Sequence, residues 1–311
     1  MTQIKYTLIN GGSGLIGSRL IKKFDKKKIK IYFKRKIYEK IFKEYKTAHL
    51  DFSKKNLDFS FLKNTKTLIH AASLDEKMSN KYPEKAKIIN YDFIKKLFDA
   101  CKKHNVKRLI KISTSKVYGK VLNKKITEKS SLNPYDNYTL YHAKSDIFLQ
   151  KYGKNSCIDI IILRVSNGFG YPTFDNQRCW ELIANNFCHN AYHSKVIEIK
   201  SKINYIKNFV DMNYLIKIIK FFNDYPKKVS GVFNVGSKNN ISLYNMASKI
   251  KRIAIKNKLN NIKILSSFNK KKANIKYYYS IKKLLRFGCN VKENQDIEIN
   301  NLFKFLKKNI S

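Results

Sequence analysis

The chain has 311 residues, 43% of them hydrophobic, with 20 Phe, 20 Tyr, four Pro and 11 Gly, a composition that can bury a large core and excludes a disordered or linker-rich chain. Its net charge is +43, from 65 basic and 22 acidic residues, which would ordinarily suggest nucleic acid as a partner. The basic residues are overwhelmingly Lys, however, whereas proteins that read bases and clamp phosphates favour Arg. We therefore expect a solvated, lysine-rich surface that attracts an anionic small substrate, and no nucleic-acid site.

Nothing in the sequence predicts a membrane span or a disulfide framework. The first residues, MTQIKYTLINGG, contain no hydrophobic run of signal-peptide length, and the most apolar stretch, IDIIILRV, is too short to cross a bilayer. The five cysteines are odd in number and show no Cys-x-x-Cys spacing, which favours reduced thiols over disulfides or zinc. We expect a cytoplasmic protein without a metal site.

Strands and helices alternate along the first half of the chain. The pattern predicts strands at residues 4–9, 28–33, 65–72, 106–113 and 158–164. Helical spacing of apolar residues predicts helices over 86–103 and 137–152. Alternation at these lengths predicts an α/β fold with a Rossmann-like doubly wound parallel sheet.

Beyond residue 167 the alternation loosens, although helical and strand patterns continue. We expect residues 1–166 to form a dinucleotide-binding domain, to which 206–236 return, and residues 167–311 to form a smaller substrate-binding lobe. Such a lobe would cover the carboxyl ends of the strands, where open α/β sheets bind their ligands.

A glycine-rich turn joins the first expected strand to the first helix. Gly11, Gly14 and Gly17 follow the strand in the spacing Gly-x-x-Gly-x-x-Gly. Glycines at such a junction permit a tight turn, a close approach of backbone N–H groups to a pyrophosphate, and close packing of helix on strand. The position of this turn in an alternating chain predicts a dinucleotide site.

Two further positions bear on which dinucleotide is bound. An acidic residue about 20 positions beyond the glycines usually holds the ribose 2′-hydroxyl of NAD, whereas a basic residue accommodates the 2′-phosphate of NADP. This chain has Lys34 and Arg35 near that place, which favours NADP, but basic residues are so common here that Arg35 shifts the choice only slightly. Asp51, in the segment HLDFS between the strands expected at 28–33 and 65–72, is either placed to meet the adenine or a plain turn carboxylate.

Several segments together resemble the extended short-chain dehydrogenase/reductase family, the NAD-dependent epimerase/dehydratase group that modifies nucleotide sugars. They occur in family order and cover nearly the whole chain: NGGSGLIG, LIHAAS, INYDFIKKLFDACKKHNVKRLIKISTSKVYG, NPYDNY, LRVSNGFGYP, KNFVDMNYL and GVFNVGS. The segment KRLIKISTSKVYG is the most specific of them. SNGFG followed by CWELIANNFCHNA is most similar to members from surface-polysaccharide gene clusters.

The resemblance implies a nucleotide-sugar substrate and an NAD cofactor, with NADP as the alternative. The implied cofactor contacts, besides the glycines, Arg35 and Asp51, are Leu15, Ile16, Phe52, Ala71, Ala72 and Asn90. The implied substrate contacts are Ser73 and Asn167. Members of this family commonly pair through two helices, so the helices at 86–103 and 137–152 are the candidate surface of a homodimer.

The resemblance also implies a catalytic threonine and a catalytic tyrosine. Thr114 stands three residues before the VYG triplet, where the family's Ser or Thr bonds the reacting hydroxyl. The family's general base is the Tyr of a Tyr-x-x-x-Lys pattern. Tyr138 matches that position, because its distances along the chain to Thr114, Pro134 and Asp146 are those of the family.

The lysine position of that pattern holds His142. A tyrosine with an ordinary pKa near ~10 needs a neighbouring cation to act as a base at neutral pH, and a histidine with an ordinary pKa near ~6.5 is mostly neutral there. Two interpretations stay open: a histidine-assisted tyrosine, or a site that binds cofactor and turns over slowly. The other register, Tyr141 with Lys144, breaks the family's spacings, and Lys144 is expected to be a solvated surface lysine.

The residues after Thr114 bear on the reaction. Dehydratases of this family carry an acidic residue two positions after the threonine, where this chain has Lys116 after Ser115, so 4,6-dehydration is disfavoured. Reversible hydride transfer at a sugar carbon remains, in an epimerase that retains NAD or a reductase that consumes NADPH, and we favour the epimerase. Outside enzyme chemistry, the alternative is a non-catalytic protein that binds a dinucleotide or nucleic acid.

Overall fold

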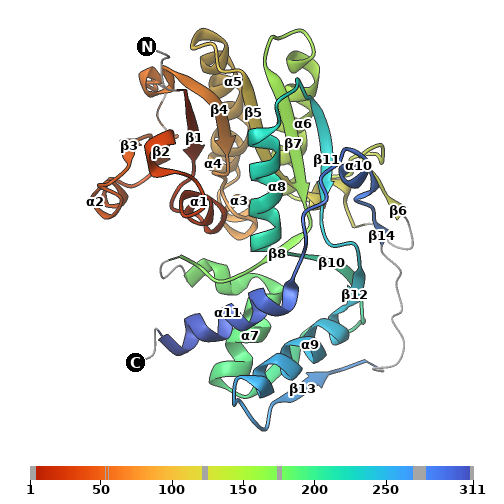
Figure 1. Cartoon of the computed structure of the whole chain (residues 1–311). Helices are drawn as coiled ribbons and strands as arrows, with labels where there is room; N and C mark the ends of the chain where they lie inside the picture. Colours follow the sequence, from red (N-terminus) through yellow and green to blue (C-terminus); the bar gives the residue numbers. More distant parts are fainter. Residues whose placement is uncertain are drawn as a thin grey trace. The chain divides into compact units, whose positions relative to one another are not determined.

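The computed structural model describes residues 5–52, 54, 56–120, 125–173, 177–268 and 278–308. The chain divides into two compact units (Figure 1). The first comprises Met1–Lys120, Ser131–Arg164 and Ile219–Phe233, and the second comprises Val121–Ser130, Val165–Ile218 and Asn234–Ser311. The segment that returns to the first unit is therefore shorter than the expected 206–236.

A seven-stranded sheet forms the centre of the first unit, in the order β11-β7-β5-β4-β1-β2-β3 among the described residues (Figure 1). Its strands are β1 (Tyr6–Asn10), β2 (Ile29–Phe33), β3 (Lys46–His49), β4 (Thr65–His70), β5 (Arg108–Thr114), β7 (Asp159–Val165) and β11 (Gly231–Val235). β1 pairs in parallel with β2 and β4, β2 with β3, and β4 with β5. The prediction of a Rossmann-like doubly wound sheet is confirmed. The order reverses between β1 and β4, the point where such sheets bind ligands at their carboxyl ends.

Helices connect the strands of the first unit. They are α1 (Leu15–Ile21), α2 (Ile37–Ile41), α3 (Glu76–Lys81), α4 (Pro83–Lys87), α5 (Phe93–Lys103) and α6 (Asn137–Gly153), with the short turns η1 (Lys26–Lys28), η2 (Ser60–Leu62), η3 (Ile88–Asp92) and η4 (Ser115–Tyr118). α5 is amphipathic and buries Phe93, Leu97 and Cys101 in the core. η3 is a single π-helical turn, a feature that often marks functional sites.

The second unit has its own small sheets and its own core. Its strands are β6 (Lys125–Ile126), β8 (Asn167–Phe169), β9 (Val196–Ile199), β10 (Ile206–Asp211), β12 (Asn240–Ser242), β13 (Lys263–Ser266) and β14 (Tyr278–Tyr279). Its helices are α7 (Ile183–His193), α9 (Leu243–Lys256), α10 (Lys282–Arg286) and α11 (Gln295–Lys308), with η5 (Gln177–Glu181), while α8 (Met212–Asp224) begins here and ends in the first unit. α7, α9 and α11 pack on one another around a hydrophobic core (Figure 1).

The described residues contain neither a membrane-spanning helix nor a group of metal-ligating side chains. Every helix there is too short or too polar to cross a bilayer. Within the same residues, no three His, Cys, Asp or Glu side chains are grouped so that they could hold a metal ion.

Candidate active site

The glycine turn between β1 and α1 depends on all three predicted glycines. Gly11 has a φ of +94°, which favours glycine, and a Cβ there would lie 2.7 Å from the Ala72 backbone N. A Cβ on Gly17 would lie 2.1 Å from the Gly11 carbonyl O, so α1 can approach the turn only without a side chain. The Gly14 N–H donates to the Gly11 carbonyl at 3.0 Å and closes the turn.

The backbone at Gly14 is open on one side. A Cβ on Gly14 would meet only the Gly11 carbonyl O, at 3.4 Å, so the side of Gly14 that faces away from the protein is open. No side chain caps α1, which begins here with Leu15 and Ile16, both partly exposed. An open backbone at a helix N-terminus is the arrangement that anionic groups bind.

The other predicted cofactor residues near β2 and β3 differ in their surroundings. Arg35 is exposed just after β2. Asp51 lines a hollow of about 340 Å³ with Tyr32 and Leu50. Phe52 is part of the core, where its ring lies 4.5 Å from that of Phe93 between centroids. Only the backbone of Phe52 can therefore face a ligand.

The loop after β4 is held in place by Asn90. The Asn90 side chain accepts from the Leu74 backbone N at 2.8 Å and donates to the Leu74 carbonyl O at 3.2 Å. Ala71 is fixed from the other side, because its N–H donates to the Asn10 carbonyl at 2.9 Å. Ser73 is exposed between these anchors. Asn90 sits on the π-helical turn η3, so this turn aims a buried amide at the loop.

Thr114 at the end of β5 and Tyr138 at the start of α6 lie near each other. Thr114 is the last residue of β5, and its Oγ1 accepts the Lys116 backbone N–H at 3.2 Å. The Thr114 side chain lies near enough to the Tyr138 hydroxyl to lower the pKa of that phenol. Because a threonine hydroxyl carries one proton, Thr114 can accept from the backbone and donate that proton to Tyr138.

The first turn of α6 fixes the position of Tyr138. Asp136 is the N-cap, and its carboxylate accepts the Thr139 N–H at 2.8 Å while Thr139 Oγ1 accepts the Asp136 N–H at 3.1 Å. This reciprocal capping box satisfies backbone donors that the helix leaves unpaired. Asn80 of α3 adds a bond from outside, accepting the Asn137 N–H at 3.1 Å. Tyr138 is therefore the second residue of a well-capped helix.

The charges around Tyr138 oppose its ionisation. Burial raises the pKa of Tyr138 above its ordinary value, the Thr114 side chain lowers it, and the carboxylates of Glu76, Asp136 and Asp75 raise it again. Glu76 forms an ion pair with Lys116, which offsets part of its charge. Tyr138 thus has a neighbour that stabilises its anion, but the charged groups that act on it are acids.

His142 lies one turn beyond Tyr138 on α6, with 4.5 Å between their ring centroids. The His142 side chain is 4% exposed, and neither ring nitrogen has a hydrogen-bond partner among the described residues. Burial and the nearby charge of Lys111 lower the pKa of His142 to about 3, so the ring is neutral. Buried polar atoms usually have a hydrogen-bond partner, so these two nitrogens are an exception within the described residues.

Tyr141 and Lys144, the pair in the other register, do not form a buried tyrosine–base pair. Tyr141 is buried, whereas Lys144 is exposed and places its Nζ 5.7 Å from the centre of the Tyr141 ring. Asn167 belongs to the second unit, where its side chain donates to the Asn208 carbonyl at 2.8 Å.

Several residues of this region were missed by the sequence reasoning. They are Glu76 on α3, Asp136 at the α6 cap, His70 at the end of β4 and Lys111 in β5. The sequence could have indicated Lys111, because a lysine inside an otherwise apolar strand needs a buried partner. No such indication exists for Glu76, since nothing in the sequence relates α3 to the end of β5.

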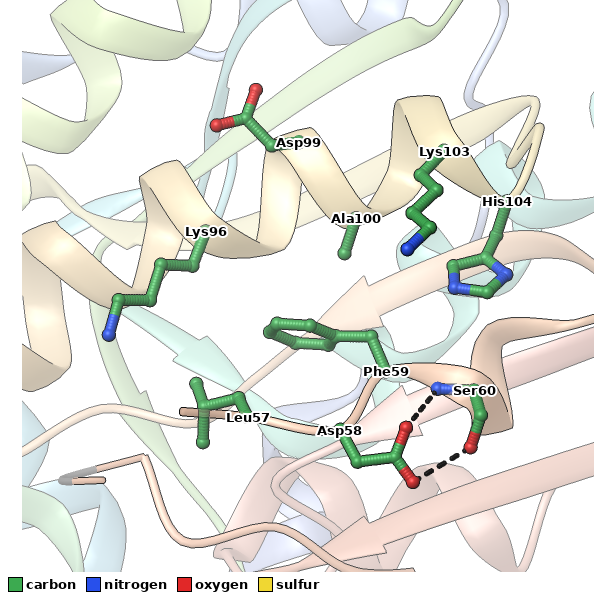
Figure 2. A pocket seen from close by; sticks show the side chains of 9 residues that line it. All are labelled: Leu57, Asp58, Phe59, Ser60, Lys96, Asp99, Ala100, Lys103 and His104. Atoms are coloured by element: carbon green, nitrogen blue, oxygen red, sulfur yellow. Dashed lines mark hydrogen bonds between the residues drawn. The ribbon is translucent and has the colours of Figure 1, made fainter. Parts of the chain in front are cut away.

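A second hollow, of about 370 Å³, lies between α5 and the segment Leu57–Ser60 (Figure 2). The Phe59 ring occupies its middle, and Asp58 is bonded to Ser60. This hollow is lined by the last turns of α5, which lead into the start of β5, whereas Thr114 is at the end of β5. It is not part of the Thr114 site.

Comparison with known proteins identifies the family. The model of the NAD dependent epimerase/dehydratase family matches residues 7–236. The chain belongs to this family. The match covers the glycine turn, β5 and the whole of α6, so it includes each predicted catalytic residue of this epimerase/dehydratase chain.

The curated relatives of this family member include dehydratases. A dTDP-D-glucose 4,6-dehydratase of Dictyostelium discoideum is 28% identical over 289 residues, which cover 81% of this chain and 63% of that protein. The low-salt glycan biosynthesis protein Agl12 of Haloferax volcanii is 32% identical over 74 residues, or 24% of each chain. The chain thus spans less than two thirds of the length of these relatives.

Solved structures share the fold of this family member over nearly its whole length. A UDP-N-acetylglucosamine 4-epimerase from Methanobrevibacter ruminantium M1, in complex with UDP-N-acetylmuramic acid, has a TM-score of 0.80 at 20% identity and covers 99% of this chain and 100% of its own. A UDP-glucuronic acid 4-epimerase from Bacillus cereus, in complex with NAD, has a TM-score of 0.80 at 19% identity and covers 97% of this chain and 96% of its own.

Proposed function

We propose that the chain is a nucleotide-sugar epimerase that works by reversible hydride transfer at a sugar carbon, in surface-polysaccharide synthesis. The observation that supports this most directly is the placement of Thr114 near the Tyr138 hydroxyl, beside the neutral ring of His142. Membership in the NAD dependent epimerase/dehydratase family supports the same class of reaction.

Each residue of the site has one task in this proposal. Thr114 holds the oxygen of the reacting sugar hydroxyl, and Tyr138 accepts the proton of that hydroxyl. NAD, when bound, supplies the hydride acceptor for the sugar carbon. The keto sugar then rotates in the site and is reduced on its other face. Tyr138 returns the proton to the sugar oxygen. Tyr138 must be a tyrosinate before it takes this proton, and the Thr114 side chain lowers the pKa of Tyr138 and so the cost of forming that tyrosinate.

The dinucleotide would be held by the first unit. The turn of Gly11, Gly14 and Gly17 would hold its pyrophosphate, Asp51 its adenine end, and His142 the hydroxyls of its nicotinamide ribose. The open side of Gly14 and the unpaired nitrogens of His142 support this assignment.

A reductase is the second candidate. Arg35 is exposed immediately after β2 and is free of secondary structure, which would suit a 2′-phosphate and therefore NADPH. Such an enzyme would reduce a keto sugar once and release NADP.

A 4,6-dehydratase is disfavoured, although curated relatives carry that name. Elimination of water needs a group that gives a proton to the leaving hydroxyl and another that removes a proton from carbon. Lys116 stands two residues after Thr114, where dehydratases of the family carry an acidic residue, and it is ion-paired with Glu76.

The decisive experiment is to identify the bound nucleotide and then the product. The purified protein is denatured and the released nucleotide identified, after which the native protein is incubated with UDP-glucose, UDP-N-acetylglucosamine, UDP-glucuronic acid and dTDP-glucose without added cofactor. We expect retained NAD and a C4 epimer of at least one sugar, detected by proton NMR.

Each other outcome would replace this proposal. Stoichiometric consumption of added NADPH with a keto sugar would make the chain a reductase. A 4-keto-6-deoxy product would make it a dehydratase. Bound NAD with no change in any sugar would leave a dinucleotide-binding protein without turnover.

A further inference from the structure

Two isoleucines on α2 are the most exposed large apolar residues of the described part of the chain. Ile37 is 61% exposed and Ile41 59%. They stand four residues apart, so both side chains lie on the same side of the helix. Single exposed apolar residues are common on protein surfaces, but no other two exposed large apolar residues among those described are one helical turn apart. We call Ile37 and Ile41 the isoleucine pair.

Aromatic packing holds α2 in place. Tyr38 and Phe42, on a neighbouring side of the helix, stack on the Phe33 ring at the end of β2, with centroid distances of 5.7 Å and 5.1 Å. α2 joins β2 to β3, the strand at one edge of the seven-stranded sheet (Figure 1). The helix therefore packs its aromatic side on the first unit and leaves the isoleucine pair in water.

Basic residues surround the isoleucine pair. Lys36 and Lys40 each precede one of the isoleucines by one position, which places them about 100° around the helix, at the border of the apolar surface. Lys34, Arg35 and Lys43 are also exposed in this segment. The surface of α2 thus combines two apolar side chains with a border of positive charge.

This positive charge is denser than that of the chain as a whole. Residues 34–46 contain six basic residues in 13, whereas the whole chain contains 65 in 311. The two acidic residues of the segment are Glu39 and Glu44, and Glu44 is ion-paired with Lys26 at 3.1 Å. Lys26 belongs to η1, whose two other residues are exposed lysines. The ion pair therefore brings further basic residues close to the end of this segment.

We propose that α2 is a peripheral membrane-binding element, which lies on an anionic lipid bilayer with the isoleucine pair between the headgroups and the acyl chains and the lysines on the lipid phosphates. Such a bilayer matches this surface in both respects. Its apolar interior removes the isoleucine side chains from water, and its anionic headgroups attract each Lys or Arg that lies close to the surface. The proposal concerns a surface of the first unit and does not depend on the reaction.

Two other occupants match the surface less well. A nucleic acid would pair with the lysines but would offer the isoleucine pair little apolar surface. A second copy of this chain, docked through the same face, would bring the lysines of both copies together, and like charges repel. Only the bilayer is complementary to the apolar pair and to the charge around it.

The test is co-sedimentation of the full chain with lipid vesicles. Vesicles of phosphatidylcholine alone are compared with vesicles of equal parts phosphatidylcholine and phosphatidylglycerol, and we expect binding only to the second kind. Ile37→Ser/Ile41→Ser should weaken this binding by about tenfold or more, because the burial of two apolar side chains is lost. The matched control is Ile255→Ser/Ile297→Ser, which removes isoleucines that are 47% and 54% exposed on α9 and α11. We expect the control to bind as the wild type does.

A second set of variants tests the place of the charge. Lys36→Gln/Lys40→Gln/Lys43→Gln should weaken binding by about fivefold for each lysine removed, if each lies close to the lipid phosphates. The control removes the same net charge from exposed lysines of the second unit: Lys200→Gln/Lys256→Gln/Lys263→Gln. We expect a clearly smaller loss in this control. Thermal unfolding followed by circular dichroism checks that each variant is folded.

Four outcomes would overturn the proposal. They are wild-type protein that does not bind the anionic vesicles, binding that is unchanged in Ile37→Ser/Ile41→Ser, equal losses in the two lysine variants, and a wild-type dimer that the isoleucine variant converts to a monomer in sedimentation velocity. The last outcome would make the isoleucine pair an interface between copies. Absence of turnover with every nucleotide sugar would refute the proposed function and would leave the vesicle result unaffected.

Discussion

The Thr114 side chain lowers the pKa of Tyr138, but the charges that act on this hydroxyl are those of carboxylates, which raise it. A phenol in these surroundings is a weak base until a positive charge arrives beside it. The oxidised nicotinamide ring carries such a charge, so we expect Tyr138 to become an effective base only in the complex with the oxidised dinucleotide. This dependence would limit proton abstraction to the state in which hydride can be accepted.

Replacing Tyr138 by Phe tests its role as the base. We expect kcat to fall by about 10²–10⁴-fold, the usual contribution of a general base, because Phe keeps the ring that packs on His142 and loses only the hydroxyl. NADH binding should stay close to the wild-type value. The measurements are kcat by NMR detection of product and the dissociation constant of NADH by fluorescence titration.

Tyr141→Phe is the matched control, since it removes a tyrosine hydroxyl from a buried residue of the same helix, whose ring faces Lys144. We expect its kcat to be nearly that of the wild type. Equal losses in the two variants would mean that the helix, and not the Tyr138 hydroxyl, was disturbed.

At this scale the sequence predicted some residues and missed others for a physical reason. Thr114 and Tyr138 could be predicted because a strand end and a helix position are fixed by counting along the chain. The charges that act on them could not, because Glu76 reaches Lys116 from α3 across 40 positions of sequence, and Lys111 reaches Asp146 across 35. Such partners depend on how elements pack.

The first turn of α6 links the stability of an element to the site. Asp136→Ala removes the N-cap, and we expect the free energy of unfolding to fall by about 1 kcal/mol. Because Tyr138 is the second helical residue, kcat should fall as well. Urea unfolding and steady-state assays measure the two effects.

Asp136→Asn separates the cap from the charge. Asn is as good an N-cap as Asp, and the change removes a carboxylate that raises the pKa of Tyr138. We expect stability close to that of the wild type and a kcat that is retained or higher. If the free energy of unfolding is as low in Asp136→Asn as in Asp136→Ala, Asp136 does not stabilise the protein as an N-cap.

The buried histidines of β4 and α6 predict how stability depends on pH. Burial lowers the pKa of His70 and of His142 to about 3 in the folded protein, while the unfolded chain has the ordinary value near ~6.5. Below about pH 6.5 the unfolded state therefore binds more protons, and the free energy of unfolding falls as the pH falls, by up to about 1.4 kcal/mol per pH unit for each histidine.

We expect this loss between about pH 6.5 and about pH 5 in the wild type, measured by urea unfolding at a series of pH values. His70→Asn should make the dependence less steep, because Asn keeps an acceptor for the Asn10 amide and does not titrate. Asp211 of the second unit has the opposite effect on the pH dependence of the free energy of unfolding, since burial raises its pKa to about 6. A slope that is the same in His70→Asn and the wild type would contradict the assignment.

At the scale of elements, alternation of apolar runs predicted the order of strands and helices because buried parallel strands are continuous apolar runs. It did not predict the π-helical turn at Ile88–Asp92, which inserts one residue into an otherwise regular helix pattern and aims Asn90 at the Leu74 loop. It also did not predict how α3 and α6 are joined through Asn80, since short polar contacts leave no periodicity.

The whole molecule carries 65 basic and 22 acidic residues, and its surface lysines repel one another. Ion pairs at the surface, such as Lys26 with Glu44 and Lys102 with Asp99, offset little of this repulsion because exposed pairs contribute at most about 1 kcal/mol each. The sequence predicts the sign of this effect completely, since repulsion at long range depends on net charge more than on the fold.

We therefore expect salt to stabilise the protein. Raising NaCl from about 0.01 M to about 0.15 M shortens the Debye length from about 30 Å to about 8 Å, which weakens repulsion between distant lysines more than attraction within close pairs. The melting temperature should rise by a few degrees in calorimetry. Sucrose at equal osmolality is the control for effects that do not depend on charge, and a melting temperature that falls with NaCl would mean that close ion pairs, not net repulsion, dominate the electrostatics of this chain.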